Sequence, residues 1–287
     1  MTRNTATSIG FVAVLLWALL ALFTAGSEPV PPFLLNAMTF TIASIIGVIW
    51  VLARGRVSVL RPVPWTIYAF GTAGLFGYHA LYYSALRLAP PAEAGLIAYL
   101  WPLLIVLFSG LLPGERLRTG HIVGALVSFG GAALIVSRGG LSLESAATPG
   151  LILAAFCALT WSSYSVLSRR MDDTPTEVVT VYCIATAILS VPAHLAFETT
   201  VWPDSNIAWL SVLALGLGPV GLAFYVWDIG VKRGDIQLLG VASYAAPLLS
   251  TLVLIAAGIA QVSWQLLVAA VLISFGAGIA AMASRDS

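Results

Sequence analysis

Long apolar segments follow one another along the whole chain, separated by short breaks rich in proline, glycine and charged residues. An α-helix needs about 20 apolar residues to cross the hydrocarbon core of a bilayer. Because backbone groups in lipid must bond within their own segment, runs of this length are expected to be helices. The pattern predicts ten spans, over residues 7–24, 33–53, 64–87, 92–112, 119–137, 150–169, 176–197, 207–231, 236–258 and 263–283.

The second half of the chain repeats the first. Arg87, Gly95, Tyr99 and Pro102-Leu103-Leu104 return 145 positions later as Lys232, Gly240, Tyr244 and Pro247-Leu248-Leu249. Each copy holds five predicted spans. Since five is odd, the second copy starts from the opposite side of the membrane, so the two copies are expected to have inverted topology. The domains predicted are residues 1–140 and 141–287.

The charged residues support a membrane protein and give its orientation. Only 9% of the residues are charged, 60% are hydrophobic, and the mean hydropathy is +0.98. With the N-terminus inside, eleven of the 13 Lys and Arg residues fall on one side, and only Arg87 and Arg138 fall on the other. Because positive charge gathers on the cytoplasmic side, both termini are expected there. A net charge of +1 gives no indication of a nucleic-acid partner.

Two prolines predict where a binding site could form. Pro102 and Pro247 lie near the middle of the fourth and ninth predicted spans. Proline has no N–H, so the carbonyls of Ala98 and Ser243 lose their usual helical partner. Such carbonyls need protein, water or a substrate as a partner. Matched depth in the two copies favours hinges at a central cavity, although simple kinks served by neighbouring helices remain an alternative.

Aromatic side chains are concentrated at the same depth. Tyr and Trp usually lie at the membrane interface, but several here fall well inside their spans and need partners for their polar groups. These residues and one intramembrane histidine are the predicted substrate-binding wall: Trp17, Tyr78, His79, Tyr82, Tyr99, Trp101, Trp161 and Tyr244. Taken alone, an intramembrane histidine is more often a hydrogen-bonded core residue than a functional one.

Acidic residues are nearly missing from the predicted interior. Asp228 comes closest, and its position four residues before Lys232 predicts a local ion pair. Cys157 and Cys183 lie in apolar segments as small core residues, and no cluster has the spacing of a metal site. Catalytic sequence motifs are also missing. We therefore expect no cofactor and no metal, and an enzyme embedded in the membrane is the least favoured hypothesis.

The sequence resembles the drug/metabolite transporter superfamily with two EamA-type repeats. The resemblance rests on residues 89–97, Pro102-Leu103-Leu104, Gly114-Glu115-Arg116-Leu117, Gly124, residues 128–131, Trp161-Ser162-Ser163-Tyr164, Arg169-Arg170 and Tyr244-x-x-Pro247. Many members carry an arginine near the position of Thr39, which this chain lacks. Within the superfamily, the aromatic third and fourth spans are most similar to YddG-type exporters.

That resemblance implies an all-α integral membrane protein with ten helices around a central cavity that works by alternating access. It implies export of aromatic or other neutral amino acids and related small metabolites across a bacterial inner membrane. Because ring faces also bind cations, export of quaternary ammonium drugs is the alternative. The expected partners are a small-molecule substrate and membrane lipid, and the expected state is a monomer.

Overall fold

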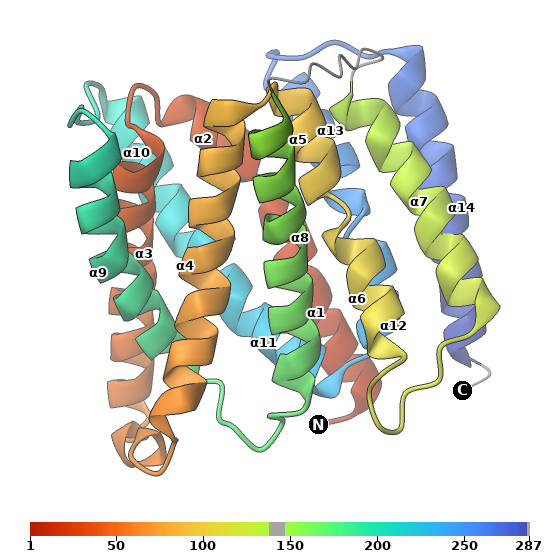
Figure 1. The fold of residues 1–287 in the computed structure, drawn as a ribbon, viewed down its shortest axis with the longest axis horizontal. Coiled ribbons are helices and arrows are strands. Elements are labelled where there is room, and N and C mark those ends of the chain that lie inside the picture. The colour runs from red at the N-terminus through yellow and green to blue at the C-terminus, as the bar shows by residue number, and fades with distance from the viewer. Residues whose placement is uncertain (138–146, 286–287) are drawn as a thin grey trace.

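A computed structural model describes residues 1–137 and 147–285, and every regular element within them is a helix (Figure 1). Arg138 and the predicted boundary between residues 140 and 141 lie outside these ranges. The first half consists of α1 (Arg3–Trp17), α2 (Leu20–Gly26), α3 (Pro32–Ala53), a 3-10 turn (Val57–Leu60), α4 (Trp65–Leu88), α5 (Pro91–Ala98), α6 (Trp101–Ser109) and α7 (Thr119–Val136).

The second half has matching elements. They are α8 (Thr148–Arg169), α9 (Val178–Phe197), α10 (Asn206–Leu217), a π-helical turn (Gly218–Leu222), α11 (Ala223–Arg233), α12 (Ile236–Ala242), α13 (Ala245–Ala256) and α14 (Trp264–Arg285). Every predicted span therefore coincides with one helix or with consecutive short helices.

Nine helical segments of the described chain are long and apolar enough to cross a membrane. The exception among the predicted spans is α4, which has 24 residues but a lower apolar content. Its sequence carries Trp65, Tyr68 and the run Tyr78-His79, together with further tyrosines near its C-terminal end. The aromatic and polar groups that make α4 a candidate wall of a site are therefore the same groups that weaken its hydropathy.

Helices from different halves form the most extensive pairs. These are α7 with α14, α3 with α9, α4 with α8, and α1 with α11. Figure 1 shows α3 and α9 together at one edge of the molecule and α7 and α14 together at the other. The large aromatic core joins inner helices, with Trp101 and Trp161, to the edge helices α3 and α9, with Phe40 and Tyr182.

Glycines allow the closest of these contacts. A methyl group added at Gly276 of α14 would lie 2.5 Å from the carbonyl oxygen of Gly124 on α7, and the reverse substitution would lie equally close to the Gly276 carbonyl. Small residues let helix backbones approach in this way. By contrast, Gly278 has nothing within 4 Å of such a methyl group.

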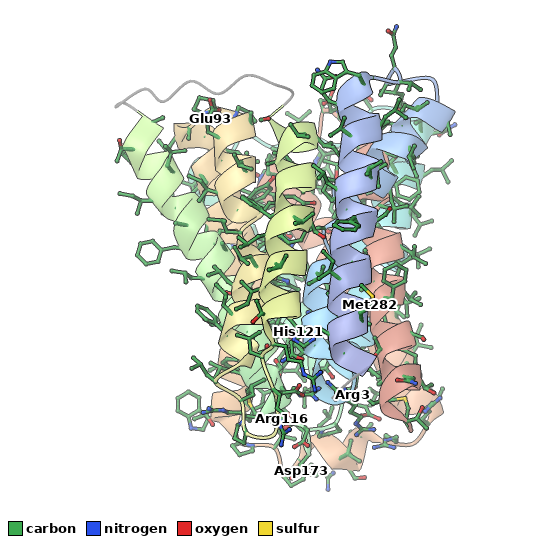
Figure 2. The ribbon with its side chains drawn as sticks, turned by 90° about the vertical axis from the view of Figure 1, so that its right-hand side faces the viewer. Arg3, Glu93, Arg116, His121, Asp173 and Met282 are labelled. Atoms are coloured by element: carbon green, nitrogen blue, oxygen red, sulfur yellow. The ribbon has the colours of Figure 1, made fainter. Side chains whose placement is uncertain are left out.

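Both chain termini lie at the same end of the molecule (Figure 1). Figure 2 places Arg3, Arg116, His121 and Asp173 at that end and Glu93 at the opposite end. At the terminal end, Glu115 pairs with both Arg3 and Arg169. At the other end, the Glu198 carboxylate accepts from the backbone N–H groups of Phe33 and Leu34, and so caps the first turn of α3.

Candidate functional site

Two membrane-spanning segments are interrupted, one in each half of the chain. The first interruption separates α5 from α6 at Tyr99 and Leu100, and the second separates α12 from α13 at Ser243 and Tyr244. Pro102 occupies one of the first two positions of α6, where a missing N–H has no helical partner to lose. The predicted kinks are thus breaks, placed a few residues before each proline.

A pocket of about 150 Å³ lies beside these interruptions. Rings dominate its wall, and apolar groups complete it. It is lined by Trp17, Leu20, Tyr78, His79, Tyr82, Ala98, Tyr99, Trp101, Trp161, Pro219, Val220, Phe224 and Ala246. Seven of the eight residues predicted as a substrate-binding wall are therefore brought together, and the lining includes no acidic or basic side chain other than His79.

Tryptophans form one side of the pocket. The Trp17 ring lies 6.0 Å from both Trp101 and Trp161, edge to face, and 5.0 Å from Trp227. Such pairs are favoured by the ring quadrupoles. The Trp17 indole N–H donates to the Pro219 carbonyl at 3.2 Å. The π-helical turn thus satisfies the polar group of Trp17, and the ring contributes apolar surface to the pocket wall.

His79 has one nitrogen committed to the backbone. Its Nδ1 lies 2.7 Å from the Leu75 carbonyl oxygen. Because a carbonyl can only accept, Nδ1 carries the proton in this contact, and Nε2 of the neutral ring is an acceptor. The ring packs edge-on against Phe40 at 5.1 Å and Phe224 at 6.1 Å. His79 therefore offers a positioned acceptor among apolar rings.

Tyrosines of α4 extend this wall. The rings of Tyr78 and Tyr82 are parallel within 6° and 6.1 Å apart, as expected one turn apart on a helix. Tyr78 also lies 5.3 Å from Trp161 on α8. The packing of α4 along α8 therefore joins the aromatic side chains of both halves into one continuous surface.

Tyr244 does not line the pocket. It is fully buried, and its hydroxyl accepts a hydrogen bond from the Leu103 N–H at 3.0 Å. Leu103 directly follows Pro102 at the other interruption, where the backbone leaves N–H groups to be satisfied. The prediction that Tyr244 lies in the cavity wall therefore differs from the structure, in which it connects the two interruptions.

Sequence reasoning missed several lining residues, of which Phe224 is the most informative. An apolar ring in an apolar span carries no polar signal, whereas its neighbours Tyr225 and Trp227 carry polar groups. The Tyr225 hydroxyl is directed instead toward Ala43 and Thr180, and Trp227 donates to the Ser165 hydroxyl at 3.1 Å. Only the repeat reveals Phe224, because it stands 145 residues after His79.

Pro219 was also missed, although its signal was available. The dipeptide Gly218-Pro219 interrupts an apolar run and so indicates an irregular helix. The structure has a π-helical turn there, and the Pro219 carbonyl accepts from Trp17. This turn brings Pro219 and Val220 into the pocket wall.

The ion pair predicted between Asp228 and Lys232 is present in the structure. Asp228 and Lys232 pair at 2.8 Å as predicted, with side chains only 1% and 4% exposed. The Thr176 hydroxyl also donates to Asp228 at 2.8 Å. This ion pair is separate from the pocket wall, and the described residues hold no cluster suited to a metal ion.

Comparisons with known proteins agree with this arrangement. The chain is 56% identical to the aromatic amino acid exporter YddG of Ancylobacter novellus, across 99% of this chain and 100% of that protein. It is 27% identical to the aromatic amino acid exporter YddG of Salmonella typhimurium, across 88% of each. A solved crystal structure with 56% identity matches it with a TM-score of 0.95 and covers 99% of each chain.

The family assignment accounts for both halves of the molecule. The model of the EamA-like transporter family matches twice in succession, over residues 5–137 and 148–282. These ranges cover the helices that form the pocket and nearly all of the described chain. Many apolar helices, two family repeats and a ring-lined pocket between them describe a multi-pass membrane protein. The chain belongs to the EamA-like transporter family.

Proposed function

We propose that this protein exports aromatic amino acids across the bacterial inner membrane, from the cytoplasm outward, by alternating access. The observation that carries the proposal is the ring-lined pocket beside two interrupted helices. Flat rings stack or pack edge-on with a wall of Trp, Tyr and His side chains. The names of the YddG relatives from two bacteria point to the same cargo.

The polar end of the cargo has partners within the same pocket. His79 Nε2 is an acceptor for an ammonium group, and Ala98, whose carbonyl precedes the first interruption, also lines the wall. The pocket volume of about 150 Å³ is below the roughly 300–1,000 Å³ typical of ligand sites. Substrate binding therefore requires the pocket to widen, as a transport cycle does.

The proposed architecture has ten membrane helices in two inverted five-helix repeats, with α4 as the tenth span. Two findings support it. Both termini lie at one end, as an even number of spans requires. The pairing of α4 with α8 has its counterpart in the pairing of α11 with α1, which is the pattern expected if a pseudo-two-fold axis exchanges the repeats. The proposed state is a monomer with both termini in the cytoplasm.

Transport into proteoliposomes tests the proposal. Purified protein should accumulate labelled phenylalanine or tryptophan faster than empty vesicles do, and Trp101→Ala should slow this accumulation. A matched control is Trp202→Ala, since Trp202 is 56% exposed and is not part of the pocket. Wild-type rates equal to those of empty vesicles, over amino acids and organic cations, would contradict the proposal.

Export of quaternary ammonium compounds is the second candidate. The ring faces of Trp17, Trp101 and Trp161 favour it because cations bind over aromatic faces. The pocket wall includes no carboxylate to add to that attraction. A quaternary ammonium that competes with phenylalanine at equal or lower concentration would make it the better assignment.

A further inference from the structure

A second cleft opens at the end of the molecule that holds both termini. Its volume is about 630 Å³, within the range of small-molecule sites. In contrast to the ring-lined pocket, its wall holds charged and hydroxyl side chains beside apolar groups. It is lined by Arg3, Asn4, Thr7 and Ser8 of α1, by Asp235 and Leu238 at the start of α12, and by Ala281 and Ser284 of α14.

One cation and one anion face each other in this wall. A guanidinium nitrogen of Arg3 lies 3.4 Å from Oδ2 of Asp235, with side chains 43% and 10% exposed. Asp235 is held in place, because Oδ1 accepts from the Leu238 N–H at 2.8 Å and its own N–H donates to the Thr7 hydroxyl at 2.8 Å. The anion is therefore fixed, whereas the more exposed arginine has room to move.

Arg3 can leave this pair without stranding its other partner. It also lies 3.3 Å from Glu115, but Glu115 is paired with Arg169 as well. Arg169 is in turn anchored by donating to the carbonyls of Val231 and Gly234 at 3.1 and 2.7 Å. The Arg3 side of the pair is exposed to solvent, which weakens the attraction between the two charges, so a ligand with matching charges can replace it.

We propose that this cleft is where an α-amino acid first binds from the cytoplasm, its carboxylate to Arg3 and its ammonium to Asp235. The zwitterion replaces the Arg3–Asp235 pair, so that one ion pair is broken and two are formed. Leu238 and Ala281 provide the apolar surface for its side chain. The inference rests on the proposed export of amino acids and assigns the recognition of their common polar end.

The cleft is connected to the ring-lined pocket through one short helix. Asp235 caps the start of α12, and α12 ends at the second interruption. Within α12, Gly240 lies close to the backbone of the other interrupted helix, since a methyl group added there would be 3.2 Å from the Pro102 carbonyl oxygen. Beyond the interruption, Ala246 lines the ring-lined pocket. A ligand held by Asp235 is therefore bound at the start of the helix whose end leads, through the second interruption, to the pocket wall.

Inhibition constants measured from the cytoplasmic face test the proposal. Inside-out membrane vesicles present this face to the medium, and three unlabelled competitors of labelled phenylalanine uptake separate the charges. These are phenylalanine itself, phenylethylamine, which lacks the carboxylate, and 3-phenylpropanoate, which lacks the ammonium. Arg3→Gln should weaken phenylalanine and 3-phenylpropanoate about fivefold and leave phenylethylamine unchanged.

Asp235→Asn should give the complementary pattern. It should weaken phenylalanine and phenylethylamine by a similar factor and leave 3-phenylpropanoate unchanged, since asparagine preserves the helix cap but not the charge. Arg116→Gln and Asp173→Asn are matched controls, being exposed charges at the same end that do not line the cleft, and neither should change any constant. Arg3→Lys should recover part of the lost affinity for 3-phenylpropanoate.

The outcomes separate the two proposals. If the Arg3–Asp235 pair only holds the end of the molecule closed, both variants will change all three constants by the same factor. That result, or unchanged constants in both variants, would overturn the binding site while leaving the exporter intact. Failure of wild-type vesicles to take up phenylalanine would instead contradict the proposed function itself. Melting temperatures of the variants confirm that the compared proteins are folded.

Discussion

The rings of His79 and Phe224 meet at 6.1 Å and an angle of 77°, and the two residues occupy the same position in the two repeats. A position that the repeat duplicates therefore faces its own copy inside the pocket. One copy offers a nitrogen acceptor, and the other offers only a hydrocarbon ring. His79 thus gives the pocket a nitrogen acceptor that the equivalent position of the second repeat lacks.

Replacing His79 with phenylalanine should make this pair alike and impair transport. The variant keeps the ring contacts with Phe40 and Phe224 but removes the Nε2 acceptor. Loss of a hydrogen bond to a charged group is worth about 1.5–3 kcal/mol, so kcat/KM for phenylalanine should fall about tenfold or more. Initial rates of phenylalanine uptake into proteoliposomes measure this change in kcat/KM. His79→Gln, which retains an acceptor, should lose less; equal losses in both variants would show that the acceptor is unimportant.

Tyr244→Phe should reduce stability more than substrate affinity. The substitution leaves the Leu103 N–H without the hydroxyl that accepts its hydrogen bond, and an unsatisfied buried donor costs about 1–3 kcal/mol. Thermal unfolding in detergent should begin several degrees lower. The matched variant Tyr99→Phe, at the same position of the other repeat, should instead raise KM, because Tyr99 lines the pocket. Identical effects of the two changes would argue against this division of roles.

Gly276→Ala should weaken the pairing of α7 with α14. The new methyl group would overlap the Ser128 hydroxyl oxygen and lie 2.5 Å from the Gly124 carbonyl oxygen, and overpacking of this kind costs about 1–3 kcal/mol. A lower melting temperature and reduced yield of folded protein are the expected results. Gly278→Ala, two residues along the same helix, has open space and should be harmless. If Gly278→Ala were also destabilising, the loss of stability would come from replacing a glycine in α14 and not from the contact of Gly276 with α7.

Glu198→Gln should loosen the end opposite the termini. The Glu198 side chain is 1% exposed. Its carboxylate oxygens lie 2.9 Å from Arg87 and 2.8 Å from His194, and they accept hydrogen bonds from the first turn of α3. Glutamine keeps one acceptor but loses the charge, so stability should fall by roughly 1–2 kcal/mol. Glu28→Gln is the control, since Glu28 is an exposed acid that precedes α3. The comparison is made by thermal unfolding, and equal melting temperatures for the two variants would exclude a special role of Glu198.

The order and extent of the helices followed from apolar run lengths and from prolines at the breaks. The span predicted over 64–87 became α4 at Trp65–Leu88, although its rings lower its hydropathy. The length of an apolar segment does not show where the helix inside that segment is interrupted. A proline shows that an N–H is missing, but it does not show that the helix breaks at Tyr99 and Leu100 or that the Tyr244 hydroxyl accepts from the Leu103 N–H beyond the break.

Depth in the membrane could be predicted for the pocket residues, but the direction of each side chain could not. Tyr99 and Tyr244 are equivalent in the repeat and lie at matching interruptions. Only the partner from the other half, the Leu103 N–H, turns Tyr244 away from the pocket. Similarly, Phe224 lines the pocket while Tyr225 does not, because adjacent residues on a helix point about 100° apart. Long-range contacts of this kind are not encoded in local pattern.

The pairing of helices across the repeats has a consequence for how the molecule moves. Each of the four closest helix pairs contains one helix from either repeat, so the two halves are interleaved and neither is a separate rigid body. A cycle in which one half rocks as a block against the other would have to pull all four pairs apart. We therefore expect the moving units to be helix pairs that each contain one helix from either repeat, with bending at the interrupted helices.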